Sequence, residues 1–113
     1  MPKNWNEYLD GLRSDITSLS EVNPKIGEGL DLLESAPALT GKLDAKTCEL
    51  IALAVAVTTR CEGCITFHAK KAQELGLTEQ EVAEALSVAV ALNAGAAFVY
   101  SSKVIDALKH FTK

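Results

Sequence analysis

Residues 50–57 read Leu-Ile-Ala-Leu-Ala-Val-Ala-Val, an unbroken apolar run in the middle of the chain. A helix with apolar side chains on every side is typical of a buried position. We therefore expect a central helix here, with Asp44 as its N-cap and other elements covering it. Glu49 directly precedes the run. Because a buried carboxylate is rare without a partner or a chemical task, Glu49 is a candidate functional residue; the alternative is an ion pair with an arginine at a subunit boundary.

The segment before this run also carries helical signals. Apolar residues from Trp5 to Leu19 recur at intervals of three and four positions, which predicts an amphipathic first helix. Asn23 followed by Pro24 is typical of a helix cap with proline at the first helical position, and it predicts a second helix. Two helices are therefore expected to precede the central one.

The last third of the chain contains a further group of helix signals. Thr78 and Glu81 have the spacing of a capping box, which predicts a helix start. Asn93 and Gly95 predict a break or kink before a last helix. No segment alternates apolar and polar residues for long, so strands are not expected. The predicted fold is all-α, with five or six helices in a single domain that comprises residues 1–113.

Cys61 and Cys64 are separated by two residues, and His68 follows four residues after Cys64. If this segment is helical, side chains at positions i, i+3 and i+7 share one face. Two thiols one turn apart can form a disulfide, and an imidazole one turn further along can accept a thiol proton. The spacing therefore predicts redox or nucleophilic thiol chemistry.

Glu49 can join this group if the central helix and the helix of the cysteines run back against each other across a corner near Arg60. Glu49 to Arg60 then spans about 16 Å and Cys61 to His68 about 10 Å, at roughly 1.5 Å per residue. The remaining offset of roughly 6 Å is one that two side chains and a water can span. The sequence is therefore compatible with a proton relay from Glu49 through His68 to Cys64.

Other types of site can also use a Cys-X-X-Cys pair. A structural zinc site needs about four ligands, for which Cys48 and His68 are the available additions. Because Cys48 belongs to the central helix and is most simply a small buried hydrophobe, we expect no metal site. Inert buried thiols are a second alternative, which the polar context of residues 60–64 disfavours. His68 taken alone fits a boundary histidine with satisfied hydrogen bonds.

Composition and charge narrow the functional classes. The net charge of −4 gives no support for binding to nucleic acid or to an anionic membrane. No run of about 18 uninterrupted apolar residues occurs, so we expect no membrane span. Residues 1–7 lack the apolar core of a secretory signal, so we expect a cytoplasmic location. In that compartment the Cys-X-X-Cys pair is more typical of catalysis or metal binding than of a structural disulfide.

Three consecutive stretches together resemble the carboxymuconolactone decarboxylase-like family. They are residues 43–57 with Glu49, residues 61–68 with Cys61-Glu62-Gly63-Cys64 and His68, and residues 69–82. The similarity extends from about Leu43 to Leu108. Within the family, the order Glu, Cys-X-X-Cys, His resembles the alkylhydroperoxidase D branch. The resemblance implies an all-helical subunit that assembles into a homotrimer or homohexamer.

The resemblance also implies an activity, the thiol-dependent reduction of a hydroperoxide without a metal or organic cofactor. Cys64 would be the attacking thiol, Cys61 the resolving thiol, and His68 with Glu49 the proton relay. A dithiol or a thiol protein would then reduce the oxidised pair. Gly63 departs from the best-known members of the branch, which carry a second histidine at this position.

Two other activities remain open. The same cysteines could exchange electrons with a protein partner, as in a disulfide reductase or redox adaptor, or they could only sense oxidants. The family also contains decarboxylases that act on γ-carboxymuconolactone. Since those enzymes generally lack the cysteine pair, decarboxylation is the less favoured expectation.

Overall fold

The computed structural model of the chain describes residues 3–112. Within that range the chain forms helices and connecting turns, and it contains no strand. In chain order the elements are α1 (Trp5–Val22), α2 (Pro24–Ser35), the 3₁₀ helix η1 (Ala36–Ala38), α3 (Ala45–Thr59), α4 (Glu62–Glu74) and α5 (Glu79–Thr112). The all-α prediction is confirmed for the described residues.

Side-chain caps determine where the middle helices begin. The Asn23 side-chain oxygen accepts the N–H of Lys25 at 3.2 Å, and Pro24 is the first residue of α2. The Asp44 carboxylate accepts the N–H of Thr47 at 2.8 Å at the start of α3. Each bond satisfies a backbone donor that has no partner inside the helix. Both helix starts lie where the sequence predicted them.

The predicted capping box opens α5. The Thr78 hydroxyl accepts the Glu81 N–H at 3.1 Å, and the Glu81 carboxylate accepts the Thr78 N–H at 3.0 Å. The second bond lowers the pKa of the Glu81 carboxyl group, because it favours the ionised form. This reciprocal pair fixes the first turn of the longest helix.

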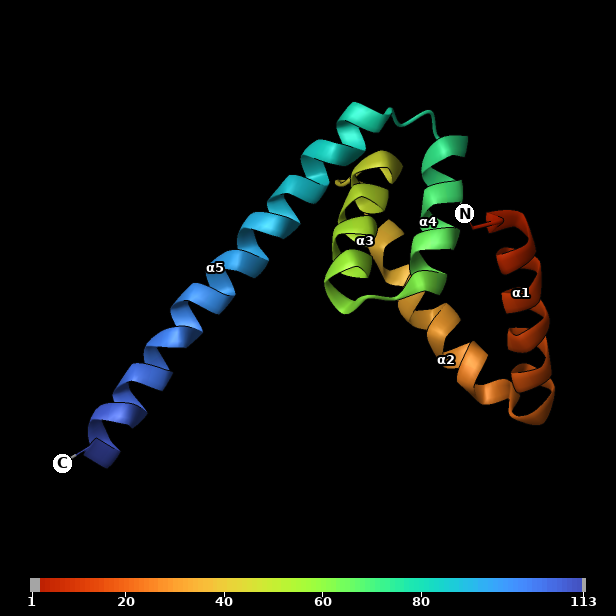
Figure 1. Ribbon diagram of the computed structural model, residues 1–113. Coiled ribbons are helices and arrows are strands. Elements are labelled where there is room, and N and C mark those ends of the chain that lie inside the picture. The colour runs from red at the N-terminus through yellow and green to blue at the C-terminus, as the bar shows by residue number, and fades with distance from the viewer. Residues whose placement is uncertain (1–2, 113) are drawn as a thin grey trace.

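The folded body is built around α3, with α4 along one side and the first half of α5 along another (Figure 1). α1 packs against α4 and α2. The most deeply buried side chains come from α1, α3, α4 and α5 and are Leu9, Leu53, Ala56, Thr66, Ala72 and Ala89. This small core holds α3 and α4 together but leaves much apolar surface uncovered in a single chain.

α3 itself is covered on only part of its circumference. Leu53 is 5% exposed, whereas Ile51 and Val55 are 49% and 54% exposed. The prediction that the whole run 50–57 is buried is therefore wrong for the single chain, because α4 and α5 cover only two sides of the helix. A groove between α3 and α5 is lined by Ile51, Ala54, Val55, Thr58, Val88, Ala89, Leu92 and Asn93.

α5 is one continuous helix of 34 residues, and its second half projects from the body (Figure 1). Every side chain from residue 90 to residue 112 is exposed. The radius of gyration is 18.7 Å, compared with about 13 Å for a compact chain of about 100 residues. The molecule is therefore far more extended than a chain that buries its own apolar residues.

The predicted break at Asn93 and Gly95 is wrong. The Asn93 amide donates one hydrogen bond to the Ala89 carbonyl at 2.7 Å, within the helix. It donates another to the Thr58 hydroxyl of α3 at 2.9 Å. Because these bonds satisfy the amide without a change of backbone direction, α5 continues through this position.

The apolar composition of α5 has two interpretations. By length and composition alone, α5 could cross a membrane, and it is the one helix within residues 3–112 with this property. The same composition suits a helix that is covered by other subunits of an oligomer. The absence of a membrane partner and the homo-oligomer both stay predictions.

Candidate functional site

The chain turns from α3 to α4 at Arg60, which adopts the left-handed conformation with φ 56°. The Arg60 N–H bonds to the Val57 carbonyl at 3.3 Å, and the Cys61 N–H bonds to the Ala56 carbonyl at 3.0 Å. These bonds satisfy carbonyl groups at the end of α3 that lack partners inside the helix. The corner places α4 beside α3, as the sequence predicted.

Cys61 is the N-cap of α4, so the helix itself begins at Glu62. Its sulfur accepts the Cys64 N–H at 3.2 Å. The structure joins the two cysteines in a disulfide, with their Cα atoms 5.2 Å apart. Both residues are partly exposed. The pair is therefore positioned both for bonding to each other and for access by a partner molecule.

Glu49 and His68 form a direct hydrogen bond between α3 and α4. The His68 Nδ1 atom lies 3.0 Å from Oε2 and 3.3 Å from Oε1 of Glu49. The Glu49 side chain is 13% exposed and the His68 side chain 36%. A carboxylate at Nδ1 favours the tautomer that donates from Nδ1, which leaves Nε2 as the proton acceptor. The predicted pairing is thus present without the water that the helix offset suggested.

His68 lies on α4 one helical turn after Cys64, at the i+4 position. Side chains with this spacing are neighbours on a helix surface. Within residues 3–112 the hydrogen bonds of the His68 ring go to Glu49, and none joins the ring to either sulfur of the disulfide. In this oxidised form the four predicted residues form two bonded pairs, Cys61 with Cys64 and Glu49 with His68.

Cys48 is separate from these pairs. It is half-buried on α3, and its thiol donates to the Leu43 carbonyl at a sulfur–oxygen distance of 3.8 Å. Among residues 3–112, no group of three or more His, Cys, Asp or Glu side chains is arranged to hold a metal ion. Cys48 is thus not part of the disulfide in this structure.

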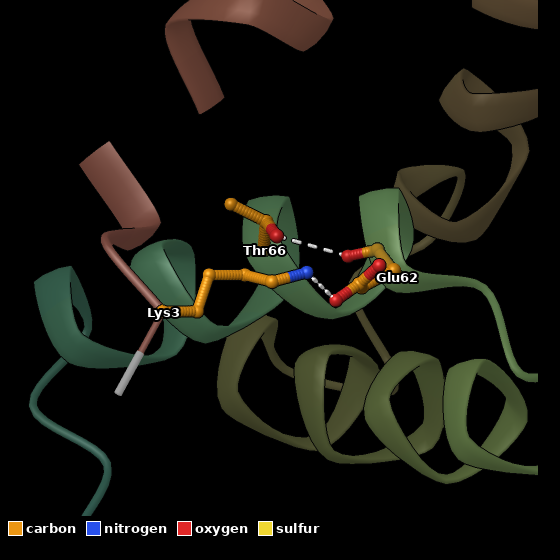
Figure 2. Close-up of polar contacts among 3 residues, drawn as sticks. All are labelled: Lys3, Glu62 and Thr66. Atoms are coloured by element: carbon orange, nitrogen blue, oxygen red, sulfur yellow. Dashed lines mark hydrogen bonds and ion pairs between the residues drawn. The ribbon is translucent and has the colours of Figure 1, made fainter. Parts of the chain in front are cut away.

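The sequence analysis missed contacts from the N-terminal segment (residues 3–22) to the Cys-X-X-Cys motif. Figure 2 shows the Lys3 ammonium in an ion pair with the Glu62 carboxylate, while the Thr66 hydroxyl donates to the Glu62 carbonyl at 2.9 Å. Leu12 packs against Gly63. No local sequence signal could have found these contacts, because Lys3 and Glu62 are 59 positions apart.

Known proteins provide an independent comparison. The chain is 48% identical over 104 residues to an uncharacterised protein of Haemophilus influenzae, and the match covers 92% of each chain. The crystal structure of an apo carboxymuconolactone decarboxylase family protein from Legionella pneumophila superposes with a TM-score of 0.74 at 30% identity, covering 99% of this chain and 100% of that one. A crystal structure from Methanobacterium thermoautotrophicum gives a TM-score of 0.68 at 36% identity, covering 76% of this chain and 97% of that one.

The profile of the carboxymuconolactone decarboxylase family matches residues 24–107. This range begins at the first residue of α2 and contains Glu49, both cysteines of the motif and His68. Sequence profile and fold agree over most of the chain. This protein belongs to the carboxymuconolactone decarboxylase family.

Proposed function

We propose that this protein is a thiol-dependent peroxidase of the alkylhydroperoxidase D type. The proposal depends chiefly on one observation: the Cys61–Cys64 disulfide lies one helical turn from His68, whose Nδ1 is 3.0 Å from the Glu49 carboxylate. A thiol pair that can be oxidised and a histidine oriented by a carboxylate are the two parts that peroxide reduction by cysteine needs. Membership of the family supports the proposal at the level of the fold.

The first chemical step belongs to Cys64 and His68. A free thiol with a pKa of about 8.5 is mostly protonated at neutral pH, so Nε2 of His68 accepts the Cys64 proton. The thiolate attacks the distal oxygen of the hydroperoxide, and the O–O bond breaks. The leaving alkoxide takes the proton from His68 and departs as an alcohol, while Cys64 becomes a sulfenic acid. Glu49 stabilises the imidazolium that forms in between.

Cys61 completes the oxidative half of the cycle. Its sulfur attacks the sulfenic sulfur of Cys64, the S–S bond forms, and the hydroxyl group leaves as water with the Cys61 proton. A dithiol or a thiol protein then attacks the disulfide, forms a mixed disulfide, and leaves in oxidised form as both protein thiols are restored. The reaction requires no metal and no organic cofactor.

The setting of this activity is part of the proposal. A reducing cytoplasm would supply the thiol donor, and the whole chain, residues 1–113, would act as one domain. We infer that the subunits assemble into a homotrimer or homohexamer, because apolar side chains of α3 and α5 are exposed in the single chain.

The test is the consumption of hydrogen peroxide and of an organic hydroperoxide, measured with a panel of dithiol donors. We expect turnover with the unchanged protein and with Cys48→Ser, and none with Cys64→Ser. Peroxide consumption that is equal in Cys64→Ser would overturn the proposal. Turnover of a disulfide substrate without any peroxide activity would instead assign a disulfide reductase, and turnover of γ-carboxymuconolactone a decarboxylase.

A further inference from the structure

Both residues between the two cysteines are contacted by the N-terminal segment. The ion pair between Lys3 and Glu62 engages the first of them (Figure 2). Gly63 is the second: a Cβ atom at this position would lie 2.9 Å from Cδ2 of Leu12. Because real Cβ atoms essentially never approach another atom this closely, Leu12 occupies the space that any larger residue would need. A larger residue at position 63 would therefore require the Leu12 methyl group to shift.

Two further side chains of α1 tie this segment to the folded body. The Arg13 guanidinium lies 5.8 Å from the centre of the Phe67 ring, within the range of a cation–π interaction. Leu9, one turn before Arg13, is only 4% exposed and belongs to the core. α1 lies before the part of the chain that matches the family profile, which begins at residue 24. The superposition with the Legionella pneumophila family protein covers 99% of this chain, so the segment is shared with that structure.

We propose that Leu12 and Lys3 are positioning residues that favour the disulfide of Cys61 and Cys64 over the dithiol. A disulfide requires a narrow geometry, and the observed Cα–Cα distance of 5.2 Å satisfies it. A turn that contains glycine has much conformational freedom to lose when the S–S bond forms. Contacts that already restrain the turn reduce this loss, and the equilibrium shifts toward the disulfide.

Thermodynamic linkage makes the effect reciprocal. If the N-terminal segment packs more tightly on the turn of the disulfide form, disulfide formation strengthens that packing by the same factor. The inference rests on the proposed function only in treating the cysteine pair as redox-active. The quantity that tests the inference is the equilibrium between the dithiol and the disulfide of the protein, which involves no peroxide.

The equilibrium is measured against dithiothreitol as the reference dithiol. The protein dithiol passes two electrons and two protons to oxidised dithiothreitol, whose S–S bond breaks as the Cys61–Cys64 bond forms. Quenching by alkylation and mass determination gives the fraction of each protein form. The ratio of the two forms at known reference concentrations gives the equilibrium constant.

The main variant is Leu12→Ala, which removes the side chain that touches Gly63. We expect the equilibrium to shift toward the dithiol by about fivefold, which corresponds to about 20 mV at 29.6 mV per tenfold change. Gly11→Ala is the matched control on the same helix, because a Cβ there meets nothing within 4 Å. Lys3→Gln should give a smaller shift that salt reduces, since both partners of this pair are exposed.

A double-mutant cycle separates the effect of the contact between Leu12 and Gly63 on the equilibrium from the effect of a general loss of stability. In the presence of Leu12, Gly63→Ala should shift the equilibrium toward the dithiol, because the new methyl group forces the leucine away. In the Leu12→Ala background the methyl group has room, so its effect should be smaller. Circular dichroism should show that each variant remains helical.

Two results would overturn the inference. One is an unchanged equilibrium constant in helical Leu12→Ala protein, and the other is an equal effect of Gly63→Ala in both backgrounds. Failure of the peroxidase assay alone would leave this equilibrium shift intact. The two proposals can therefore fail separately.

Discussion

The corner between α3 and α4 and the projecting half of α5 differ in how fully their groups are paired within one chain. At the corner, backbone N–H groups, the sulfur of Cys61 and the imidazole of His68 have partners inside the chain. In the projecting half of α5 (residues 94–112), every side chain is exposed, including Phe98 at 83% and Phe111 at 82%. We infer that the thiol site is complete in one subunit, whereas α5 is built to be covered by another.

The largest effect that separates the two regions concerns His68. The substitution His68→Gln should slow the formation of the Cys64 sulfenic acid by about 10²–10⁴-fold, the usual contribution of a positioned base. Rapid mixing with hydroperoxide followed by trapping measures this rate, and light scattering should give an unchanged mass. Glu49→Gln should produce a smaller loss, because the base remains but its orientation is no longer fixed.

Glu74→Gln is the matched control for Glu49→Gln. Glu74 is also a carboxylate in the same helical body, but it lies at the end of α4, where it pairs with Lys70 at 3.7 Å. We expect Glu74→Gln to form the Cys64 sulfenic acid at the same rate as the unchanged protein. A His68→Gln protein that forms the sulfenic acid at full rate would show that the histidine is structural.

The second effect concerns α5 and appears in the molecular mass. We expect light scattering at micromolar concentration to give about three or six times the 12.0 kDa of one chain. Phe98→Asp should lower this mass, because it places a charge in the apolar half of α5, and it should leave the Cys61–Cys64 disulfide able to form. Lys109→Glu is the control, since it introduces a negative charge without removing an apolar side chain.

Two outcomes would contradict the assignment of α5 to an oligomer. The first is a stable monomer of the unchanged protein at micromolar concentration. The second is a monomer that co-floats with neutral phospholipid vesicles, which would assign the apolar surface of α5 to a membrane.

The smallest effect concerns the cap of α3. The hydrogen bond from the Thr47 N–H lowers the pKa of the Asp44 carboxyl group. Because the folded-state pKa lies below the ordinary value of about 3.9, the ionised cap stabilises the fold above that value. This contribution is lost as the pH falls through the lower folded-state value.

Urea unfolding of Asp44→Asn tests this cap. The variant should be slightly less stable than the unchanged protein at pH 7, and the difference should disappear at acidic pH, where Asp44 is protonated in both states. Asp31→Asn on α2 serves as the control at another exposed acid. A difference in unfolding free energy that is the same at both pH values would contradict an electrostatic role for the cap.

The features that the sequence predicted correctly depend on residues only a few positions apart. The caps at Asn23, Asp44 and Thr78 and the Cys-X-X-Cys spacing are of this kind, because each arises within one or two turns of chain. The pairing of Glu49 with His68 was predicted, but its direct 3.0 Å contact was not, since counting residues along two helices ignores how they tilt. The sequence therefore indicated which of these two side chains pair, but not the geometry of the pair.

The features that the sequence did not predict depend on tertiary contacts. Asn93 is a poor helix residue by propensity, yet its bond to Thr58 of α3 keeps it inside a continuous α5. Gly63 was recognised only as a departure from the family pattern, whereas in the fold the Leu12 side chain packs against it. Such contacts join segments that are distant in sequence, and no local pattern encodes them.

Two physical effects compete in deciding whether Cys64 attacks the peroxide, with Cys61 as the resolving thiol, or the reverse. Cys61 is the N-cap of α4 and its sulfur accepts an N–H at 3.2 Å, an arrangement that stabilises a thiolate there. A helix N-terminus contributes about 0.3–1 kcal/mol, whereas a positioned base contributes about 10²–10⁴-fold in rate. The base should therefore decide in favour of Cys64.

Dimedone trapping after one equivalent of hydroperoxide tests this claim most directly. In the Cys61→Ser protein, mass mapping should find the dimedone adduct on Cys64, formed rapidly and slowed by adding Glu49→Gln. In the Cys64→Ser protein, Cys61 should remain largely unlabelled. Labelling of Cys61 in the Cys64→Ser protein at an undiminished rate would contradict the claim and would assign activation of the thiol to the N-terminus of α4.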